Sequence, residues 1–354
     1  MNAQFTQHNL IFKQASGTSR GVLTTKETYL LEISENNKKG IGECAIFRGL
    51  SYDDVPDYEE KLTWLCKNIN LDFEVLKKEL LHYPSIIFGL EQALLNLEHG
   101  EDLYFPSDFT DGKDSIKING LIWMGNADFM QSQIEEKLAK GFDCIKLKIG
   151  VDWKSEKEII KKLREKFPKE QLELRVDANG AFSYEEARMV LQELADLGIH
   201  SIEQPIKKSE VRSPKSEENS EKKSTDCCIP WNKMARLCAE TPTPIALDEE
   251  LIGIIDFEEK KKLLETIKPQ YIILKPALVG GFSGSDEWIV LAESLGIDWW
   301  ITSALESNIG LNAICQYTYT KKNPLPQGLG TGALFTNNFE THLQLEDDQM
   351  WYKK

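Results

Sequence analysis

The sequence predicts an α/β protein: a modified (β/α)8-type barrel, of the (β/α)7β kind, preceded by an N-terminal α+β capping domain. From Lys117 onward, short apolar runs that suit buried strands alternate with segments whose apolar residues recur at helical spacing. Such alternation is typical of a parallel barrel. Before Lys117, β-like runs are followed by helical stretches, which favours a separate α+β domain. We therefore expect domains at residues 1–115 and 116–334, with the tail 335–354 returning to complete the first.

In the N-terminal part, alternating and β-branched residues predict strands at Thr28–Ser34 and Gly40–Phe47. The polar, glycine-containing stretch Ala15–Arg20 is expected to form a loop ahead of them. Helical spacing follows in three segments, which are Asp53–Asn68, Phe73–His82 and Ser85–His99.

The barrel is expected to begin with a strand at Ile118–Trp123 and a helix at Ala127–Lys140, which Gly141 ends. Phe142–Asn179 then forms a βαβ unit, because two apolar runs flank a helical pattern. Ser183 and Glu186 fit a capping box at the start of the next helix. The remaining strands are expected within HSIEQPI, PIALDEEL, YIILKPAL and DWWITSALES, with a short eighth strand in QGLGTG.

Composition excludes some classes of partner. The formal net charge of −15 over 354 residues argues against nucleic acid and anionic membranes. No apolar run approaches the ~20 residues of a membrane span, and the start lacks the pattern of a signal peptide. The seven cysteines are irregularly spaced without a CxxC, so reduced thiols and a cytoplasmic location are expected. The oligomeric state, monomer or homo-oligomer, stays open.

One pair of consecutive strand-end charges is separated by more residues than an ordinary βαβ unit contains. Glu203 and Asp248 lie 45 positions apart, whereas the other strand-end charges follow one another at ordinary βαβ spacing. The excess lies in residues 207–226, a polar tract of mixed charge that predicts a flexible insertion. It follows a strand, so it leaves the barrel on the active-site face. A solvated surface insertion is favoured there over a lid.

Charged residues stand at the ends of consecutive predicted strands, where barrel enzymes carry their catalytic groups. Burying a charged side chain at a strand end costs free energy unless the charge is paired or bound to a metal. Three carboxylates on adjacent strands suit a hard divalent cation, Mg²⁺ with Mn²⁺ tolerated. The second strand carries two lysines, and the sixth, across the barrel mouth, carries another. In chain order these residues are Lys146 and Lys148, Asp177, Glu203, Asp248 and Lys275.

This arrangement fits the removal of a proton next to a carboxylate group. The substrate class is therefore a small-molecule carboxylate, whose enediolate a cation and one lysine stabilise while a second lysine takes the proton. A lysine base needs a pKa lowered toward neutrality, which burial and a cationic neighbour can supply. Lys146, two positions before Lys148, is such a neighbour.

The motifs KLK (146–148), DAN (177–179), EQP (203–205), DE (248–249) and LKP (274–276) resemble those of the enolase superfamily and its muconate-lactonizing-enzyme subgroup. Within it the chain is most similar to the o-succinylbenzoate synthase family. The resemblance implies dehydration of 2-succinyl-6-hydroxy-2,4-cyclohexadiene-1-carboxylate to o-succinylbenzoate in menaquinone biosynthesis. It implies Mg²⁺ on Asp177, Glu203 and Asp248. It also implies Lys148 as base and then acid, and Lys275 as the residue that stabilises the enediolate.

The same resemblance implies where the substrate lies. Residues 16–21, which include Arg20, resemble a capping-domain loop that closes over the site. Residues 303–307 and 328–332 resemble segments that line the succinyl pocket, so Ser303 and Gly328 are candidate contacts. Asn179 is a further candidate, and so is Arg175, which shares a strand face with Asp177. Many subgroup members have Asp-Glu-Ser where this chain has Asp-Glu-Glu, and Glu249 is expected beside the ligands rather than among them.

Two alternatives remain on the same scaffold, a dipeptide epimerase and an N-acylamino-acid racemase, both of which use two lysines as bases. Dipeptide epimerases usually carry an acidic pair near the eighth strand, and QGLGTGAL contains no acid, which disfavours them. The racemase is harder to exclude. A barrel without catalytic activity would not need all five polar strand ends.

Overall fold

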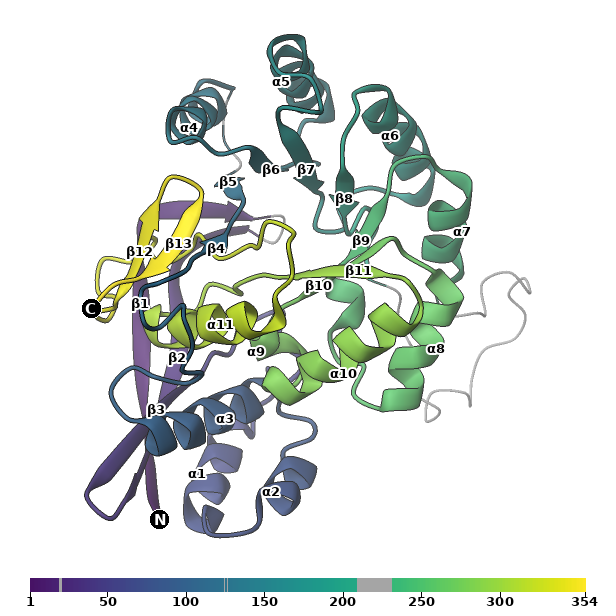
Figure 1. Cartoon of the computed structure of the whole chain (residues 1–354). Helices are drawn as coiled ribbons and strands as arrows, with labels where there is room; N and C mark the ends of the chain where they lie inside the picture. Colours follow the sequence, from purple (N-terminus) through teal and green to yellow (C-terminus); the bar gives the residue numbers. More distant parts are fainter. Residues whose placement is uncertain (19–20, 124, 126, 209–230) are drawn as a thin grey trace, which may run out of the picture.

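The computed structural model describes residues 1–18, 21–123, 125, 127–208 and 231–354 (Figure 1). Its strands form three sheets: an antiparallel sheet at the N-terminus, a seven-stranded parallel sheet, and a small sheet that includes the C-terminal hairpin. Among these residues, no helix has both the length and the apolar character needed to cross a bilayer.

The N-terminal unit places a long hairpin beside three helices. β1 (Asn2–Thr18), β2 (Gly21–Glu35) and β3 (Lys38–Cys44) pair antiparallel in that order. The expected loop at 15–20 is therefore strand as far as Thr18, because residues 16–18 pair with 21–23 of β2. The helices are α1 (Tyr58–Asn68), α2 (Phe73–Glu79) and α3 (Pro84–His99).

α1 begins five residues later than the periodicity predicts. Asp53 is turned into the interior, where its carboxylate accepts hydrogen bonds from the amide and hydroxyl of Ser85 at the start of α3 (2.9 and 2.6 Å). Pro56 lacks an amide proton, and the helix starts after it. Glycines bring α3 against β3: a Cβ on Gly42 would lie 1.9 Å from the carbonyl oxygen of Gly89.

The second unit is the barrel, whose seven parallel strands lie side by side in chain order. They are β5 (Gly120–Ile122), β6 (Cys144–Lys148), β7 (Glu173–Asp177), β8 (Ser201–Glu203), β9 (Ile245–Leu247), β10 (Tyr271–Leu274) and β11 (Asp298–Ile301). The predicted eighth strand is present only as isolated parallel bridges, from Gln327 to Ile118 and from Gly328 to Thr302. These bridges join the two edges of the sheet and close the barrel.

Helices surround the barrel sheet (Figure 1). They are α4 (Ala127–Ala139), α5 (Trp153–Lys166), α6 (Tyr184–Asp196), α7 (Asn232–Glu240), α8 (Phe257–Ile267), α9 (Pro276–Val279), α10 (Gly281–Ser294) and α11 (Asn308–Lys321). The capping box of α6 is confirmed, since Ser183 accepts from the Glu186 amide and Glu186 from the Ser183 amide. Residues 249–251 form a short 3-10 turn after β9.

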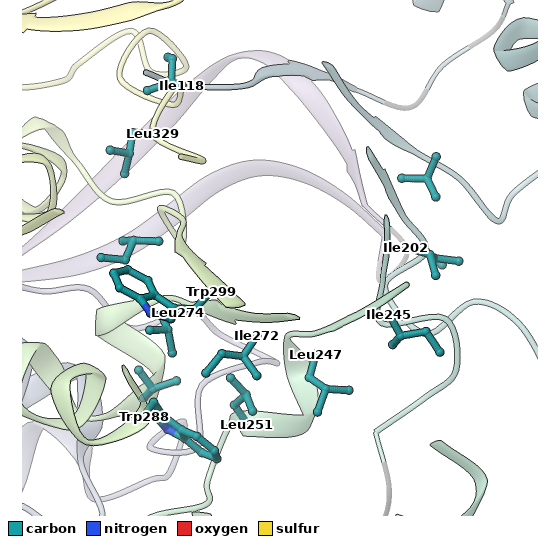
Figure 2. Close-up of a cluster of buried hydrophobic side chains, with 14 of the residues drawn as sticks. Ile118, Ile202, Ile245, Leu247, Leu251, Ile272, Leu274, Trp288, Trp299 and Leu329 are labelled. Carbon is teal, nitrogen blue, oxygen red and sulfur yellow. The ribbon is translucent and has the colours of Figure 1, made fainter. Parts of the chain in front are cut away.

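The main core lies between the outer face of the barrel strands and these helices. Strand residues alternate between faces, so Ile202, Ile245, Leu247 and Ile272 share the outward side with other apolar residues. Figure 2 shows them within a buried cluster that also contains Trp288 of α10. The alternate residues point into the barrel, where the charged side chains of the predicted site stand.

The C-terminal segment joins both units. β12 (Leu343–Glu346) and β13 (Gln349–Tyr352) form a hairpin, and β13 pairs with β4 (Ile116–Lys117) just before the barrel. Just ahead of the hairpin, residues 334–336 hydrogen-bond to the backbone of residues 11–13 in β1 (both bonds 2.8 Å).

Candidate active site

Parallel register brings the charged strand ends into one ring. Lys148 is the register partner of Asp177, and Asp177 is the partner of Glu203 on the next strand. Asp248 directly follows β9, and Lys275 directly follows β10. These side chains are buried or nearly so. The ring therefore lies at the carboxyl ends of the strands, as predicted.

Within the ring, each carboxylate contacts a lysine. Lys146 Nζ lies 2.7 Å from Glu203 Oε2 and 3.6 Å from Asp177 Oδ2. Lys148 Nζ lies 3.0 Å from Asp177 Oδ2. Lys275 Nζ pairs with Asp248 Oδ2 and lies 3.6 Å from Glu203 Oε1. No group of three or more His, Cys, Asp or Glu side chains is gathered in metal-ligand geometry anywhere in the described ranges.

The electrostatics of the ring follow from burial and from these pairs. Burial opposes the charged form of Lys275, but Asp248 and Glu203 outweigh it and raise its pKa, and Glu203 and Asp177 do the same for Lys146. The lysines hold the pKa of Asp177 well below its usual range despite burial. Burial raises the pKa of Glu203, and the charge of Asp177 adds to that rise. Burial likewise raises the pKa of Asp248.

A second layer of polar groups holds the ring in place. Lys148 Nζ donates to Asn179 Oδ1 (2.6 Å), and Asn179 Nδ2 donates to Glu249 Oε1 (3.1 Å). Gln204 Oε1 accepts from the amides of Asp248 and Glu250, both at 3.2 Å. Asn179 and Gln204 have positive φ values of 44° and 39°, a conformation that costs energy for residues with side chains. Such strain is typical of functional sites.

A cavity opens above the ring. Its empty volume is about 830 Å³, which includes space open to solvent. The lining combines charged side chains of the ring with apolar ones. Such a mixture suits a small molecule that has a polar reacting end. The lining comprises Phe47, Leu50, Asn119, Leu121, Trp123, Lys146, Lys148, Asp177, Asn179, Glu249, Lys275, Thr302, Ser303, Ala304, Leu305, Gly328, Gly330 and Thr331.

The three carboxylates suit a hard cation chemically. Asp177, Glu203 and Asp248 offer only oxygen donors from adjacent strand ends, the ligand type that Mg²⁺ prefers. Glu203 Oε1 is buried and accepts no hydrogen bond from the described residues. A buried carboxylate oxygen without a donor is costly, and ligation of a cation would satisfy it.

Two residues are predicted to contact the substrate, Arg175 and Arg20, and the structure does not place either of them at the cavity. Arg175 faces the barrel interior as expected, but it lies two residues before Asp177 and thus deeper in the barrel. Its guanidinium donates to Glu173 Oε1 (2.7 Å) and the Pro326 carbonyl (2.9 Å), and it stacks 4.1 Å above the Trp300 ring. It does not line the cavity. Arg20 lies outside the described residues.

Sequence reasoning missed the apolar part of the cavity. Phe47 and Leu50, from the segment after β3, and Trp123, from the segment after β5, carry no charge that would single them out. Trp123 ends the first predicted barrel strand, and that position alone would have placed it at the barrel mouth. The N-terminal unit therefore contributes apolar side chains to the cavity wall.

Comparison with known proteins identifies relatives along the whole chain. A family model described as enolase C-terminal domain-like matches residues 130–216. The chain is 41% identical to an o-succinylbenzoate synthase from Desulfotalea psychrophila over 379 aligned positions, which cover 98% of this chain and 97% of that protein.

Comparison with solved structures agrees with the sequence similarity. The crystal structure of MenC from Desulfotalea psychrophila superposes with a TM-score of 0.83 at 39% identity, covering 99% of both chains. A dipeptide epimerase from Enterococcus faecalis, described as complexed with Mg and the dipeptide L-Leu-L-Tyr, has a TM-score of 0.80 at 18% identity, covering 100% of this chain and 97% of its own. At that identity the second likeness shows the fold alone.

Proposed function

The chain belongs to the o-succinylbenzoate synthase family of the enolase superfamily, and from this premise we propose how its residues carry out the reaction. The activity is that of a lyase: dehydration of 2-succinyl-6-hydroxy-2,4-cyclohexadiene-1-carboxylate to o-succinylbenzoate, a step of menaquinone biosynthesis. The observation that carries the assignment of residues is the ring of three carboxylates and three lysines beneath one cavity.

Asp177, Glu203 and Asp248 would hold Mg²⁺, which supplies positive charge to the substrate carboxylate when bound. Their all-oxygen donor set and the unsatisfied Glu203 Oε1 support this assignment, and the Mg in the Enterococcus faecalis epimerase is consistent with it. Mn²⁺ is proposed as a substitute, because it accepts the same ligands.

Lys148 is the proposed base. Lys148 lines the cavity, and its Nζ is held by Asp177 and Asn179. It takes the proton from the ring carbon that bears the carboxylate, and the electron pair moves into the carboxylate to form an enediolate. The pair then returns to form the ring double bond while the adjacent C–O bond breaks. Lys148 gives its proton to the departing hydroxide, so that one water leaves and the ring becomes aromatic.

Lys275 faces the same cavity from the other side of the ring, since β10 is four strands from β6. Its pKa is raised by Asp248 and Glu203, so it is an ammonium group at neutral pH. A fixed positive charge near the developing enediolate lowers the barrier most where water is excluded. Lys146, which binds Glu203 and Asp177, is proposed to keep these carboxylates ionised and in place.

The rest of the site is proposed to bind and enclose the substrate. Ser303 and Gly328, which line the cavity, are the proposed contacts of the succinyl group, and Glu249 supports Asn179 beside the ligands. Residues 1–115 with 335–354 form the proposed cap over barrel 116–334. The cytoplasm is the proposed location.

The test is a spectroscopic assay. Purified protein with Mg²⁺ is given the cyclohexadiene substrate, and the loss of diene absorbance is followed with and without EDTA. We expect turnover that EDTA abolishes and Mg²⁺ restores. Folded, Mg²⁺-loaded protein that leaves the substrate unchanged would contradict the proposal.

An epimerase or racemase is the second candidate, because Lys148 and Lys275 both line the cavity and lie on opposite sides of the ring. Such enzymes need a base on each face of the substrate carbon. Incubation of dipeptides and N-acylamino acids in deuterium oxide, followed by mass spectrometry, would reveal exchange at that carbon. Exchange without any dehydratase activity would favour the second candidate.

A further inference from the structure

Two polar side chains of the cavity lining have no hydrogen-bond partner among the described residues. Asn119 is 3% exposed and Thr302 is 7% exposed, and both line the cavity. Asn119 Oδ1 and Thr302 Oγ1 are buried, and neither side chain bonds to another residue that the structure describes. Buried polar atoms of this kind are rare in folded proteins, because each one costs stability. In a cavity wall they indicate contact with a bound molecule.

The other polar side chains of the lining are paired. Ser303 Oγ donates to Glu306 Oε2 (2.5 Å) and accepts from Thr331 Oγ1 (2.8 Å). The charged residues and Asn179 bind one another, through contacts of Lys146 with Glu203, of Lys148 with Asp177 and Asn179, of Asn179 with Glu249, and of Lys275 with Asp248. Within the described lining, Asn119 and Thr302 are therefore the polar side chains that only a bound molecule can satisfy.

The two residues flank the segment that closes the barrel, residues 327–330. Asn119 lies just before β5, and its amide donates to the Gln327 carbonyl (2.9 Å). Thr302 lies just after β11 and forms a parallel bridge with Gly328. A Cβ on Gly328 would lie 2.4 Å from Thr302 Oγ1, so this hydroxyl lies directly against the closing segment. Glycine at position 328 therefore leaves room for the Thr302 side chain.

The order of the strands places this pair across the barrel from the carboxylates. Asp177 and Glu203 end β7 and β8, and Asp248 follows β9. The closing segment, between β11 and β5, lies four strand positions from β8 in either direction. Lys148 on β6 and Lys275 after β10 lie between the two sides. A substrate bound with its carboxylate at the carboxylate side therefore reaches the closing segment with its opposite part.

We propose that Asn119 and Thr302 form a subsite that binds the ketone oxygen of the succinyl chain and thereby orients that chain. Asn119 Nδ2 and Thr302 Oγ1 would donate the hydrogen bonds. Both groups are uncharged, which suits a neutral carbonyl better than a carboxylate, because a carboxylate buried without a cation is costly. The lysines of the lining are already paired with the ring carboxylates. The identity of this oxygen rests on the proposed function.

The test removes the hydroxyl with Thr302→Val, which keeps the shape of the side chain, and the carboxamide with Asn119→Leu. The ketone lies outside the bonds that form and break, so its contacts stabilise the bound substrate and the transition state equally. For each variant we expect KM for the cyclohexadiene substrate to rise about five- to tenfold with kcat within about twofold.

Thr318→Val is the matched control. Thr318 is also a buried threonine whose Oγ1 has no partner among the described residues, but it lies on α11 and does not line the cavity. Its KM and kcat should stay at the wild-type values. Removing a buried hydroxyl that has no partner should not lower stability, so Thr302→Val and Thr318→Val should both unfold at the wild-type urea concentration or above it.

If Thr302→Val fails to fold, Asn119→Leu and Thr302→Ser decide the matter. Asn119→Leu should raise KM, and Thr302→Ser, which keeps the hydroxyl, should not. Wild-type KM in both Thr302→Val and Asn119→Leu would overturn the proposal, and so would a rise in KM for Thr318→Val equal to that for Thr302→Val.

Calorimetric titration of the Mg²⁺-loaded protein identifies the oxygen. The ligands are o-succinylbenzoate, 2-butanoylbenzoate, which keeps the ketone but lacks the terminal carboxylate, and benzoate, which lacks both. The two ketones should bind about five- to tenfold more weakly to Thr302→Val than to wild type, and benzoate equally to both. Weakening confined to o-succinylbenzoate would overturn the assignment to the ketone.

The outcomes also separate this proposal from the proposed function. Wild-type protein that neither turns over the cyclohexadiene substrate nor binds o-succinylbenzoate would overturn the proposed function and the ketone assignment with it. Wild-type turnover with unchanged KM in the Asn119 and Thr302 variants would overturn the subsite alone.

Discussion

Glu91 links the two units of the chain and gives a pH-dependent prediction. It lies on α3, and its carboxylate accepts from the amides of Phe282 (2.5 Å) and Ser283 (3.2 Å) in the first turn of α10. The side chain is buried. Burial raises its pKa to about 7, although the hydrogen bonds from Ser283 and Phe282 act to lower it.

The sign and magnitude follow from proton linkage. The ordinary pKa is 4.5, so the folded protein binds this proton more tightly than the unfolded chain does. The resulting stability is fully present below about pH 4.5 and is lost as the pH rises through about 7. Since one pKa unit corresponds to about 1.4 kcal/mol, the whole loss is about 3 kcal/mol. Glu91→Gln removes the ionisable group and should remove this loss.

The assay is urea unfolding of wild type and Glu91→Gln at about pH 5, 6.5 and 8. The free energy of unfolding of the variant minus that of the wild type should rise by about 2–3 kcal/mol from the lowest to the highest pH. Glu98→Gln, an exposed position on the same helix, is the matched control. A difference for Glu91→Gln that is constant or falls with pH would refute the reasoning.

Two further variants test the site and the fold. Lys148→Ala should lower kcat by about 10²–10⁴-fold, because the proposed base is lost, while circular dichroism shows an unchanged fold; near-normal turnover would remove Lys148 from that role. Gly42→Ala should destabilise the protein by several kcal/mol in urea unfolding, roughly as in overpacked cores, since the added Cβ would lie 1.9 Å from the Gly89 carbonyl oxygen. Gly330→Ala, with its nearest neighbour at 3.5 Å, is the control, and equal stability of the two variants would show that β3 and α3 can separate.

Charge and periodicity in the chain were enough to predict the barrel, its strand order and the polar ring. A charged residue at a buried strand end needs a partner or a function, so Asp177, Glu203 and Lys275 stood out. Parallel pairing in chain order then required these residues to meet at one edge. The capping box at Ser183 was predictable for the same reason, since it depends only on local spacing.

Tertiary structure alone decided the depth and the partners of the side chains. Arg175 shares a strand face with Asp177, but the rise along the strand places it below the cavity, against Trp300. The eighth strand is reduced to bridges, in which Gln327 and Gly328 pair with the two edges of the sheet. Glu43 and Ser307 lie 264 positions apart in the sequence, yet the Glu43 carboxylate accepts a hydrogen bond from the Ser307 amide (3.0 Å). Their approach depends on how the N-terminal sheet packs on the barrel, and no local pattern encodes such a long-range contact.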